Sequence, residues 1–422
     1  MPLKPGAFIK ASEGTMLAIN KRRTESSHFG PCLTLVLLVL MFSSVSAQIS
    51  TSLESPWKGR EVFRQKGCNQ CHAVYGENGN GGPDLGKQKF YGTYLELAAL
   101  MWNHFPSMSQ KMRQTGYQFT ELNSEEMSQL ISYLAYFRYL GEPGIEFSGR
   151  KLLKSKGCVT CHKFGGVGGD VGPDISAIED YMAPIKLAEA LWNHGPNLLE
   201  IFEKHKVKRP EFEDDEIVNL AAGIRSFMSP RRDHPGDFAF GDPVVGYRIA
   251  EKKGCMKCHA ASADGNNLGP DFTELDLNYS VTQIAGKMWN HGPQMWEVMK
   301  RESIAFPVFE KGEIADVIAY IYGLKLKDPP GDTKEGYKIL NEKACLTCHS
   351  LQGKGARISA DLAALGALDS PLAMITAMWN HAPAMHKILQ ERKMKWQELS
   401  GRDMANLYAY LRSFSRSGKT EN

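Results

Sequence analysis

The chain lacks an excess of charge of either sign, and this narrows the partners it can have. Its 422 residues hold 50 Lys and Arg against 47 Asp and Glu. The first 47 residues contain five basic and two acidic side chains, so the rest of the chain carries 45 of each. Proteins that bind nucleic acid carry a marked basic patch. The balance predicts no nucleic-acid partner.

The chain also has little in the way of long apolar runs. The run at 33–42 is far shorter than the roughly 20 residues that a membrane-spanning helix needs. Basic residues at 21–23 precede it and Val45-Ser46-Ala47 follows, which is the pattern of a cleaved export signal. We therefore predict a signal peptide at 1–47 and an exported protein, periplasmic or at the cell surface or beyond it. A retained anchor or a buried helix is the alternative interpretation.

No cysteine is left over for a disulfide or a lone reactive thiol. Of the nine, Cys32 would leave with the signal, and the other eight all belong to copies of one pentapeptide, Cys-x-x-Cys-His. The four copies are Cys68, Cys71 and His72; Cys158, Cys161 and His162; Cys255, Cys258 and His259; and Cys345, Cys348 and His349.

The spacing of the four copies predicts tandem repeats. Their first cysteines are 90, 97 and 90 residues apart. A second histidine follows each motif histidine by 32 residues, always within Trp-Asn-His-x-Pro: His104, His194, His291 and His381. A glycine stands nine residues before each first cysteine: Gly59, Gly149, Gly246 and Gly336. We predict four domains, called repeats 1 to 4, at 48–142, 143–232, 233–328 and 329–422. Repeats 1 and 3 are offset by 187 residues, as are repeats 2 and 4, which indicates a duplicated pair.

Alternating strand patterns are also missing, so the prediction is an all-α fold of four tandem small helical domains. In each repeat the pattern is typical of helix, loop, helix and helix, with the clearest closing helices at 125–137 and 313–324. The loops after the motif, such as Tyr75–Gly86 and Phe164–Gly172, are glycine-rich and predicted to be irregular. A domain of about 90 residues is marginally stable alone, so a large buried cofactor would help to hold it together.

The pentapeptide points to covalent haem because residues i, i+3 and i+4 share one helix face. Two thiols there can form thioethers with the vinyl groups of one porphyrin, and the adjacent imidazole can bind the iron. Zinc and redox dithiols also use Cys-x-x-Cys. Zinc would need further ligands near each motif, and a dithiol does not need the histidine four times. We predict four covalent haem c groups.

Each repeat resembles the small helical class I cytochrome c domain, and the chain resembles multihaem cytochromes built from tandem copies. The motifs that carry this resemblance are the four attachment pentapeptides, the Gly-Pro-Asp stretches after them and the closing helices. The resemblance implies that a carbonyl 11 residues after the motif histidine accepts a hydrogen bond from its imidazole. That role falls to Pro83, Pro173, Pro270 and Ala360.

The sixth iron ligand departs from the family pattern, in which a Met-Pro loop before the last helix supplies it. Repeat 2 has Arg209-Pro210 there and repeat 3 has Phe306-Pro307. Only histidine is present four times, so we predict His104, His194, His291 and His381 as sixth ligands. The alternative set is Met108, Met295 and Met385, with Leu198 in repeat 2 leaving that iron open or bound by His205. Trp-Asn-His would then be a packing and hydrogen-bonding motif.

The remaining histidines lack counterparts across the repeats. His28 would leave with the signal, and we expect His205, His234 and His386 to be solvated on the surface.

The sequence also lacks a Ser/His/Asp set, a phosphate-binding loop and a pair of catalytic carboxylates. The predicted function is electron transfer between respiratory partners along the haems. The expected partners are redox proteins or a membrane quinol-oxidising complex, with peripheral membrane association. Two alternatives stay open: an oxidoreductase or peroxidase with an open iron in repeat 2, and a subunit of a membrane quinol-oxidising or extracellular electron-transfer complex.

Overall fold

A computed structural model describes residues 55–76, 79–88, 90, 92–140, 144–178, 182–228, 241–259, 268–275 and 278–417. All of these lie in one compact unit, Ser50–Asn422. The predicted signal peptide at 1–47, His28, His234 and the predicted boundaries at 142 and 232 lie outside the described residues. No helix within the described residues is long and apolar enough to cross a membrane.

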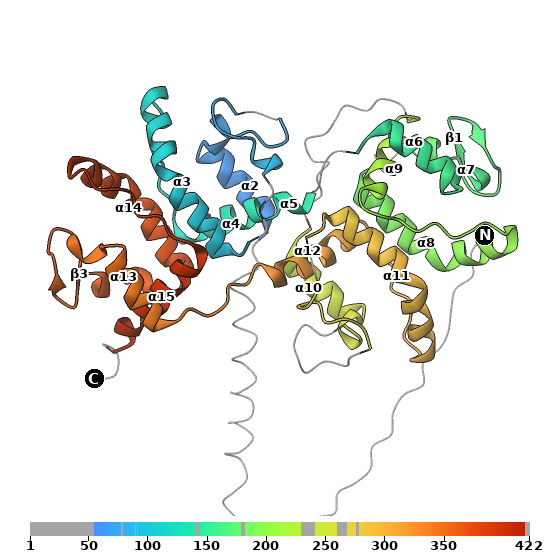
Figure 1. The fold of residues 1–422 in the computed structure, drawn as a ribbon. Coiled ribbons are helices and arrows are strands. Elements are labelled where there is room, and N and C mark those ends of the chain that lie inside the picture. The colour runs from blue at the N-terminus through green and yellow to red at the C-terminus, as the bar shows by residue number, and fades with distance from the viewer. Residues whose placement is uncertain are drawn as a thin grey trace, which may run out of the picture. The chain divides into compact units, whose positions relative to one another are not determined.

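The structure is built of helices, as predicted, and each repeat follows the same order (Figure 1). Repeat 1 contains α2 (Pro56–Gln65), η1 (Cys68–Gln70), η2 (Leu85–Lys87), α3 (Tyr94–Thr115), α4 (Ser124–Ala135) and α5 (Phe137–Leu140). Repeat 2 contains α6 (Glu146–Ser155), α7 (Cys158–Cys161), β1 (Lys163–Phe164), β2 (Val167–Gly168), η3 (Ile175–Ala177), α8 (Pro184–His205) and α9 (Glu216–Arg225). Repeat 3 contains α10 (Pro243–Lys252), η4 (Cys255–Lys257), α11 (Val281–Arg301) and α12 (Glu313–Lys325). Repeat 4 contains α13 (Thr333–Glu342), η5 (Cys345–Thr347), β3 (Ser350–Leu351), β4 (Lys354–Gly355), η6 (Leu362–Ala364), η7 (Gly366–Leu368), α14 (Pro371–Glu391) and α15 (Gly401–Ser417).

The first and last helices of each repeat pack against each other, and the repeated glycine lets them approach closely. A Cβ atom added to Gly59 would lie 1.9 Å from the Gln129 carbonyl oxygen, and one added to Gly246 would lie 1.8 Å from that of Asp316. These separations are far below contact distance, so any side chain would push the two helices apart. The glycine therefore fixes the frame that carries the Cys-x-x-Cys-His turn.

The loop after the motif is not irregular in two repeats, contrary to the sequence prediction. In repeat 2, Lys163 pairs with Gly168 and Phe164 with Val167, and β3 and β4 form the same short antiparallel hairpin in repeat 4. The turn residues Gly165 and Gly166 have φ values of 62° and 80°, the left-handed geometry that suits a two-residue hairpin. Strands of two residues are too short to show the alternation that identifies a strand in a sequence.

The long middle helix of each repeat runs through a proline without breaking. Pro106, Pro196, Pro293 and Pro383 all lie inside their helices. Proline has no N–H, so the carbonyl four residues earlier loses its helical partner. In every repeat that carbonyl belongs to the tryptophan of Trp-Asn-His.

Repeats pair in an order that differs from their order along the chain. Helices α3 and α14 bring repeats 1 and 4 together, and α8 and α11 bring repeats 2 and 3 together. Repeats 1 and 3 also meet, where the buried Tyr136 and Tyr139 hydroxyls donate to the Ala319 and Ala315 carbonyls, each at 2.8 Å. This arrangement agrees with the 187-residue duplication. The duplication relates repeat 1 to repeat 3 and repeat 4 to repeat 2, so the 1–4 pair corresponds to the 3–2 pair.

Candidate haem site

The attachment turn has the same backbone in each repeat. A left-handed residue, Gly67 in repeat 1 with φ of 73°, ends the first helix and starts a single tight turn. The amide of His72 then donates to the Cys68 carbonyl at 2.9 Å, which places the two thiols and the imidazole around one turn. The same amide bond forms from His162, His259 and His349. None of the eight cysteines in these turns is in a disulfide.

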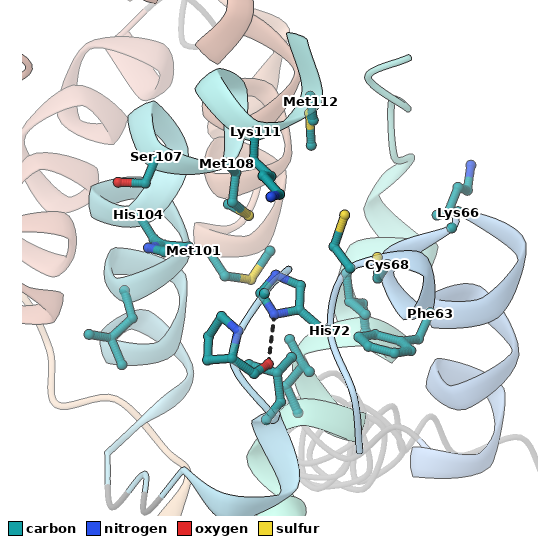
Figure 2. A pocket seen from close by; sticks show the side chains of 18 of the residues that line it. Phe63, Lys66, Cys68, His72, Met101, His104, Ser107, Met108, Lys111 and Met112 are labelled. Atoms are coloured by element: carbon teal, nitrogen blue, oxygen red, sulfur yellow. Dashed lines mark hydrogen bonds between the residues drawn. The ribbon is translucent and has the colours of Figure 1, made fainter. Parts of the chain in front are cut away.

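Each motif imidazole is oriented by a carbonyl 11 residues further along. The Nδ1 atom of His72 lies 3.1 Å from the Pro83 oxygen, drawn as the dashed line in Figure 2. The corresponding distances are 2.9 Å from His162 to Pro173, 3.0 Å from His259 to Pro270, and 2.9 Å from His349 to Ala360. Because a carbonyl oxygen can only accept, Nδ1 carries the hydrogen, and Nε2 keeps the lone pair that binds a metal.

The aspartate that follows this carbonyl holds the loop in place. Asp361 accepts hydrogen bonds from the backbone amides of Gln352, Gly353 and Ala363, and these donors lower the pKa of Asp361 to about 2. Asp84 accepts from the amides of Tyr75 and Gly86 in the same way. The loop thereby presents its carbonyl to the imidazole in a fixed position.

A cavity of about 680 Å³ opens beside the attachment turn of repeat 1. Cys71 and Pro83 belong to its lining. Cys68 and His72 lie on one side, and His104 and Met108 from α3 lie opposite them (Figure 2). Its volume is within the range of about 300–1,000 Å³ for cofactor sites. Burial raises the pKa of Cys68 to about 11. A thiol held neutral in this way is not the activated nucleophile of a redox dithiol.

The predicted sixth ligands approach the motif histidines in some repeats and not in others. The ring centroids of His72 and His104 are 6.3 Å apart, and those of His349 and His381 are 5.9 Å apart. The charge of His291 acts on His259 and lowers its pKa, after a larger effect of burial. Within the described residues, His162 and His194 form no ring contact. The Nδ1 atom of His194 lies 2.7 Å from the Ala190 carbonyl in its own helix.

The comparisons with known proteins agree with this geometry in two of the four repeats. Residues 57–137 and 333–415 match the family model of cytochrome c. These two segments are cytochrome c domains. Neither the search of curated proteins nor the search of solved structures found a match. The chain therefore contains two cytochrome c domains, and such domains imply covalent haem and electron transfer.

The residues of the first cytochrome c domain fit a haem. The cavity is walled by apolar groups on α3 and on the closing helix, and two thiols reach it from one turn. Among the described residues, the Nε2 atom of His72 has no hydrogen-bond partner. Within the described residues, no three His, Cys, Asp or Glu side chains gather as a protein-bound metal ion would need. The donor set suits a metal that brings its own macrocycle.

Two features of the site escaped the sequence prediction. Met101 lines the cavity of the first cytochrome c domain, and its position holds methionine in repeats 1, 3 and 4 but Leu191 in repeat 2. It stands directly before Trp-Asn-His, and that repeated position was the available signal. His386, expected to be solvated, is 7% exposed and packs against Phe105 and Trp396. The prediction of a solvated His386 was wrong because Phe105 and Ser109, which help to cover it, come from another repeat.

The Trp-Asn pair has a role that its own repeat does not reveal: it joins two repeats. The Asn103 amide donates to the Leu399 carbonyl at 2.8 Å and accepts from the Leu399 amide at 2.9 Å. Asn380 makes the reciprocal pair of bonds with Leu122, at 2.7 and 3.0 Å. Asn193 pairs with Phe309 and Asn290 with Phe212 in the same manner.

The tryptophans reinforce this contact. Trp102 donates to the Gln397 carbonyl, Trp192 to that of Pro307 and Trp289 to that of Pro210, at 2.8, 2.8 and 2.7 Å. The indole nitrogen of Trp379 is buried without a partner. In repeats 1 to 3 the tryptophan and the asparagine therefore both bond to the partner repeat, and in repeat 4 the asparagine does so. In repeat 1 the histidine of the tripeptide lines the cavity.

Proposed function

We propose that the chain is an exported tetrahaem c-type cytochrome that transfers electrons between redox partners. The observation that carries this proposal is the recurrence, in all four repeats, of the attachment turn with its imidazole-to-carbonyl bond. Bound haem supplies one-electron oxidation and reduction, and the protein holds it, orients it and excludes side reactions. The four domains would be those predicted, 48–142, 143–232, 233–328 and 329–422.

The residues that would hold the four haems follow from the turns. The thioethers would form at Cys68 and Cys71, Cys158 and Cys161, Cys255 and Cys258, and Cys345 and Cys348. The proximal ligands would be His72, His162, His259 and His349. Repeats 2 and 3 lie outside the matched segments, so for them the proposal rests on repeat spacing and on this shared geometry.

For the sixth ligand we propose His104, His194, His291 and His381. Two imidazoles on one metal place their ring centres roughly 6 Å apart, because each metal–nitrogen bond is about 2 Å long and each ring adds about 1 Å. The separations of 6.3 and 5.9 Å in repeats 1 and 4 agree with that value. Methionine ligation would bring Met101 or Met108 toward the metal instead.

A matched pair of variants distinguishes the two ligand sets. His104→Ala is expected to convert one haem in four from low-spin to high-spin, measured by EPR on the full-length protein carrying its haems. Met108→Ala is expected to leave all four low-spin. The opposite result would show that methionine is the ligand in repeat 1. A purified protein with fewer than four haems by mass would overturn the tetrahaem proposal itself.

A second candidate function is favoured by repeat 2. His162 and His194 make no ring contact within the described residues, and Leu198 replaces the methionine of the other repeats. An iron left open there could bind a small molecule, as an oxidoreductase or peroxidase requires. Binding of CO to one haem in four would support this candidate, and four six-coordinate low-spin haems would remove it.

The partners and location remain proposals that rest on the sequence. A basic segment, an apolar run and a small-residue site at 1–47 support export to the periplasm or beyond. Redox proteins or a membrane quinol-oxidising complex would then exchange electrons with the chain. Copurification with membranes would indicate a subunit of such a complex, and recovery in the soluble fraction would indicate a free carrier.

A further inference from the structure

One position in the loop before the closing helix packs across the paired repeats. Phe119 lies 5.4 Å from the ring of Trp379, Phe306 lies 5.3 Å from that of Trp192, and Trp396 lies 4.3 Å from that of Trp102. In repeat 2 the position holds Arg209, whose guanidinium carbon lies 4.3 Å over the ring of Trp289. Three aromatic rings and one cation thus cover the four tryptophans.

Arg209 and Trp396 are equivalent under the 187-residue duplication, and both make the same hydrogen bond. The Nε1 atom of Trp396 donates to the Trp102 carbonyl at 3.2 Å, and the Nη2 atom of Arg209 donates to the Trp289 carbonyl. Each of these carbonyls is the one freed by a proline four residues later in the helix. Stacking and hydrogen bonding at this place therefore need no charge, since Trp396 provides both as a neutral side chain.

The charge that Arg209 adds has no ion-pair partner among the described residues. Its Nε atom is buried without a hydrogen-bond partner, and no carboxylate among the described residues forms an ion pair with it. Glu211 is the acidic neighbour that acts on its charge, and that side chain is exposed. Burial lowers the pKa of Arg209, yet a guanidinium stays protonated in proteins.

The position of Arg209 relative to a haem cavity follows from repeat 1. The cavity there is lined by both Phe119 and Trp379, which correspond to Arg209 and Trp289. By this correspondence we infer that Arg209 lies at the wall of the proposed haem site in repeat 2, the repeat that also lacks the methionines of the others.

We propose that Arg209 sets the reduction potential of the haem in repeat 2, holding it above the value that a neutral residue at this position would give. The proposal rests on the tetrahaem function proposed above. Reduction adds an electron, and a nearby cation in a low-dielectric site stabilises the reduced form. At an effective dielectric constant of about 20, a nearby unit charge changes the equilibrium constant for reduction by roughly tenfold. For a one-electron couple that is about 59 mV.

The chain supplies its own matched variants. Arg209→Trp copies the residue of repeat 4 and removes only the charge, whereas Trp396→Arg places the charge in the other pair. Spectroelectrochemical titration of the full-length protein carrying its haems measures all four potentials. We expect Arg209→Trp to lower one of the four reduction potentials, by an amount that corresponds to about tenfold in the equilibrium constant for reduction. Trp396→Arg should raise a different potential by a similar amount.

Two results would overturn the proposal: four unchanged potentials in both variants, or a uniform shift of all four. Should Arg209→Trp lose haem, Trp396→Arg alone decides, because a cation in that position must raise a single potential. Failure of the underlying function looks different, since the wild-type protein would then show no haem transitions at all.

Discussion

The 1–4 pair and the 2–3 pair of repeats share one backbone frame and fill it with different side chains. The reciprocal asparagine bonds occur in both pairs. After the histidine of Trp-Asn-His, however, the 1–4 pair has Phe105 and Ala382, while the 2–3 pair has Gly195 and Gly292. The 2–3 pair has a larger side chain further along the same helix. There Trp296 stands at the position that His386 occupies in the 1–4 pair.

This difference shows which part of the contact is constrained. An asparagine that bonds both backbone groups of one facing residue fixes where the loop of the partner repeat lies against its helix. The space between the helices can then be filled from either position, provided that the total volume is kept. The large side chain accordingly comes from Phe105 in one pair and from Trp296 in the other.

The largest effect is expected from Phe105→Ala, which empties the 1–4 contact. Phe105 is 1% exposed and packs against Phe119, Trp379 and Trp396, so its loss should cost about 3–5 kcal/mol of unfolding free energy. Denaturant unfolding followed by far-UV circular dichroism measures this. Phe147→Ala is the control, because Phe147 is 67% exposed and should change stability by less than about 0.5 kcal/mol. Equal effects for the two variants would contradict the proposed packing.

A smaller effect is expected from Gly195→Ala, which overfills the 2–3 contact. The added Cβ would lie 2.5 Å from the Cζ2 atom of Trp296, at a cost of about 1–3 kcal/mol. Shortening the tryptophan in Gly195→Ala/Trp296→Leu should recover part of that loss, so the two changes should be non-additive in a double-mutant cycle. Additive effects would show that the two residues do not compete for one space.

The asparagine bonds should contribute similarly in both pairs. Asn380→Ala removes two bonds to Leu122 and Asn290→Ala removes two bonds to Phe212, each change costing about 2 kcal/mol at about 1 kcal/mol per bond. Denaturant midpoints of the two variants measured side by side test this. A large loss of stability in one variant and none in the other would show that the asparagine bonds do not stabilise the two pairs equally.

The smallest effect concerns pH and comes from His386 in the 1–4 pair. Burial, and to a lesser degree the charge of Arg113, lower the pKa of His386, whose Nδ1 lies 3.3 Å from the Ser109 hydroxyl. The unfolded chain therefore binds a proton more readily at this residue than the folded one. The contribution of neutral His386 to stability is complete above its pKa in the unfolded chain, about 6.5. That contribution is lost as the pH falls from this value toward the lower pKa of the folded state.

His386→Phe should thus lose less stability than the wild type between pH 8 and pH 5, when thermal unfolding is compared at the two values. Trp296→Phe in the 2–3 pair does not remove a titrating group and should follow the wild-type dependence. Parallel curves for His386→Phe and the wild type would show that His386 titrates alike in the folded and unfolded states.

The sequence predicted what depends on neighbours along the chain. The attachment turns, the contacts between the motif imidazoles and their carbonyls, and the order of helices all arise from residues within about 35 positions of one another. The Trp-Asn contacts could not be predicted, because Trp102 and its acceptor Gln397 are 295 residues apart and no periodicity identifies a partner. The fourfold recurrence of asparagine beside tryptophan was the visible signal. For the same reason His386 was placed on the surface, although a distant repeat covers it.

The pairing of the first repeat with the last has a consequence for biosynthesis. Trp192 finds its acceptor 115 residues later in the chain, whereas Trp102 must wait for an acceptor 295 residues later. At about 5–20 residues per second, that wait is roughly 15–60 s of translation. During this interval, the apolar face of repeat 1 is not yet packed against repeat 4. A chain that stops before repeat 4 would keep that face bare, so we expect truncated products to aggregate or to be degraded more readily than the full-length protein.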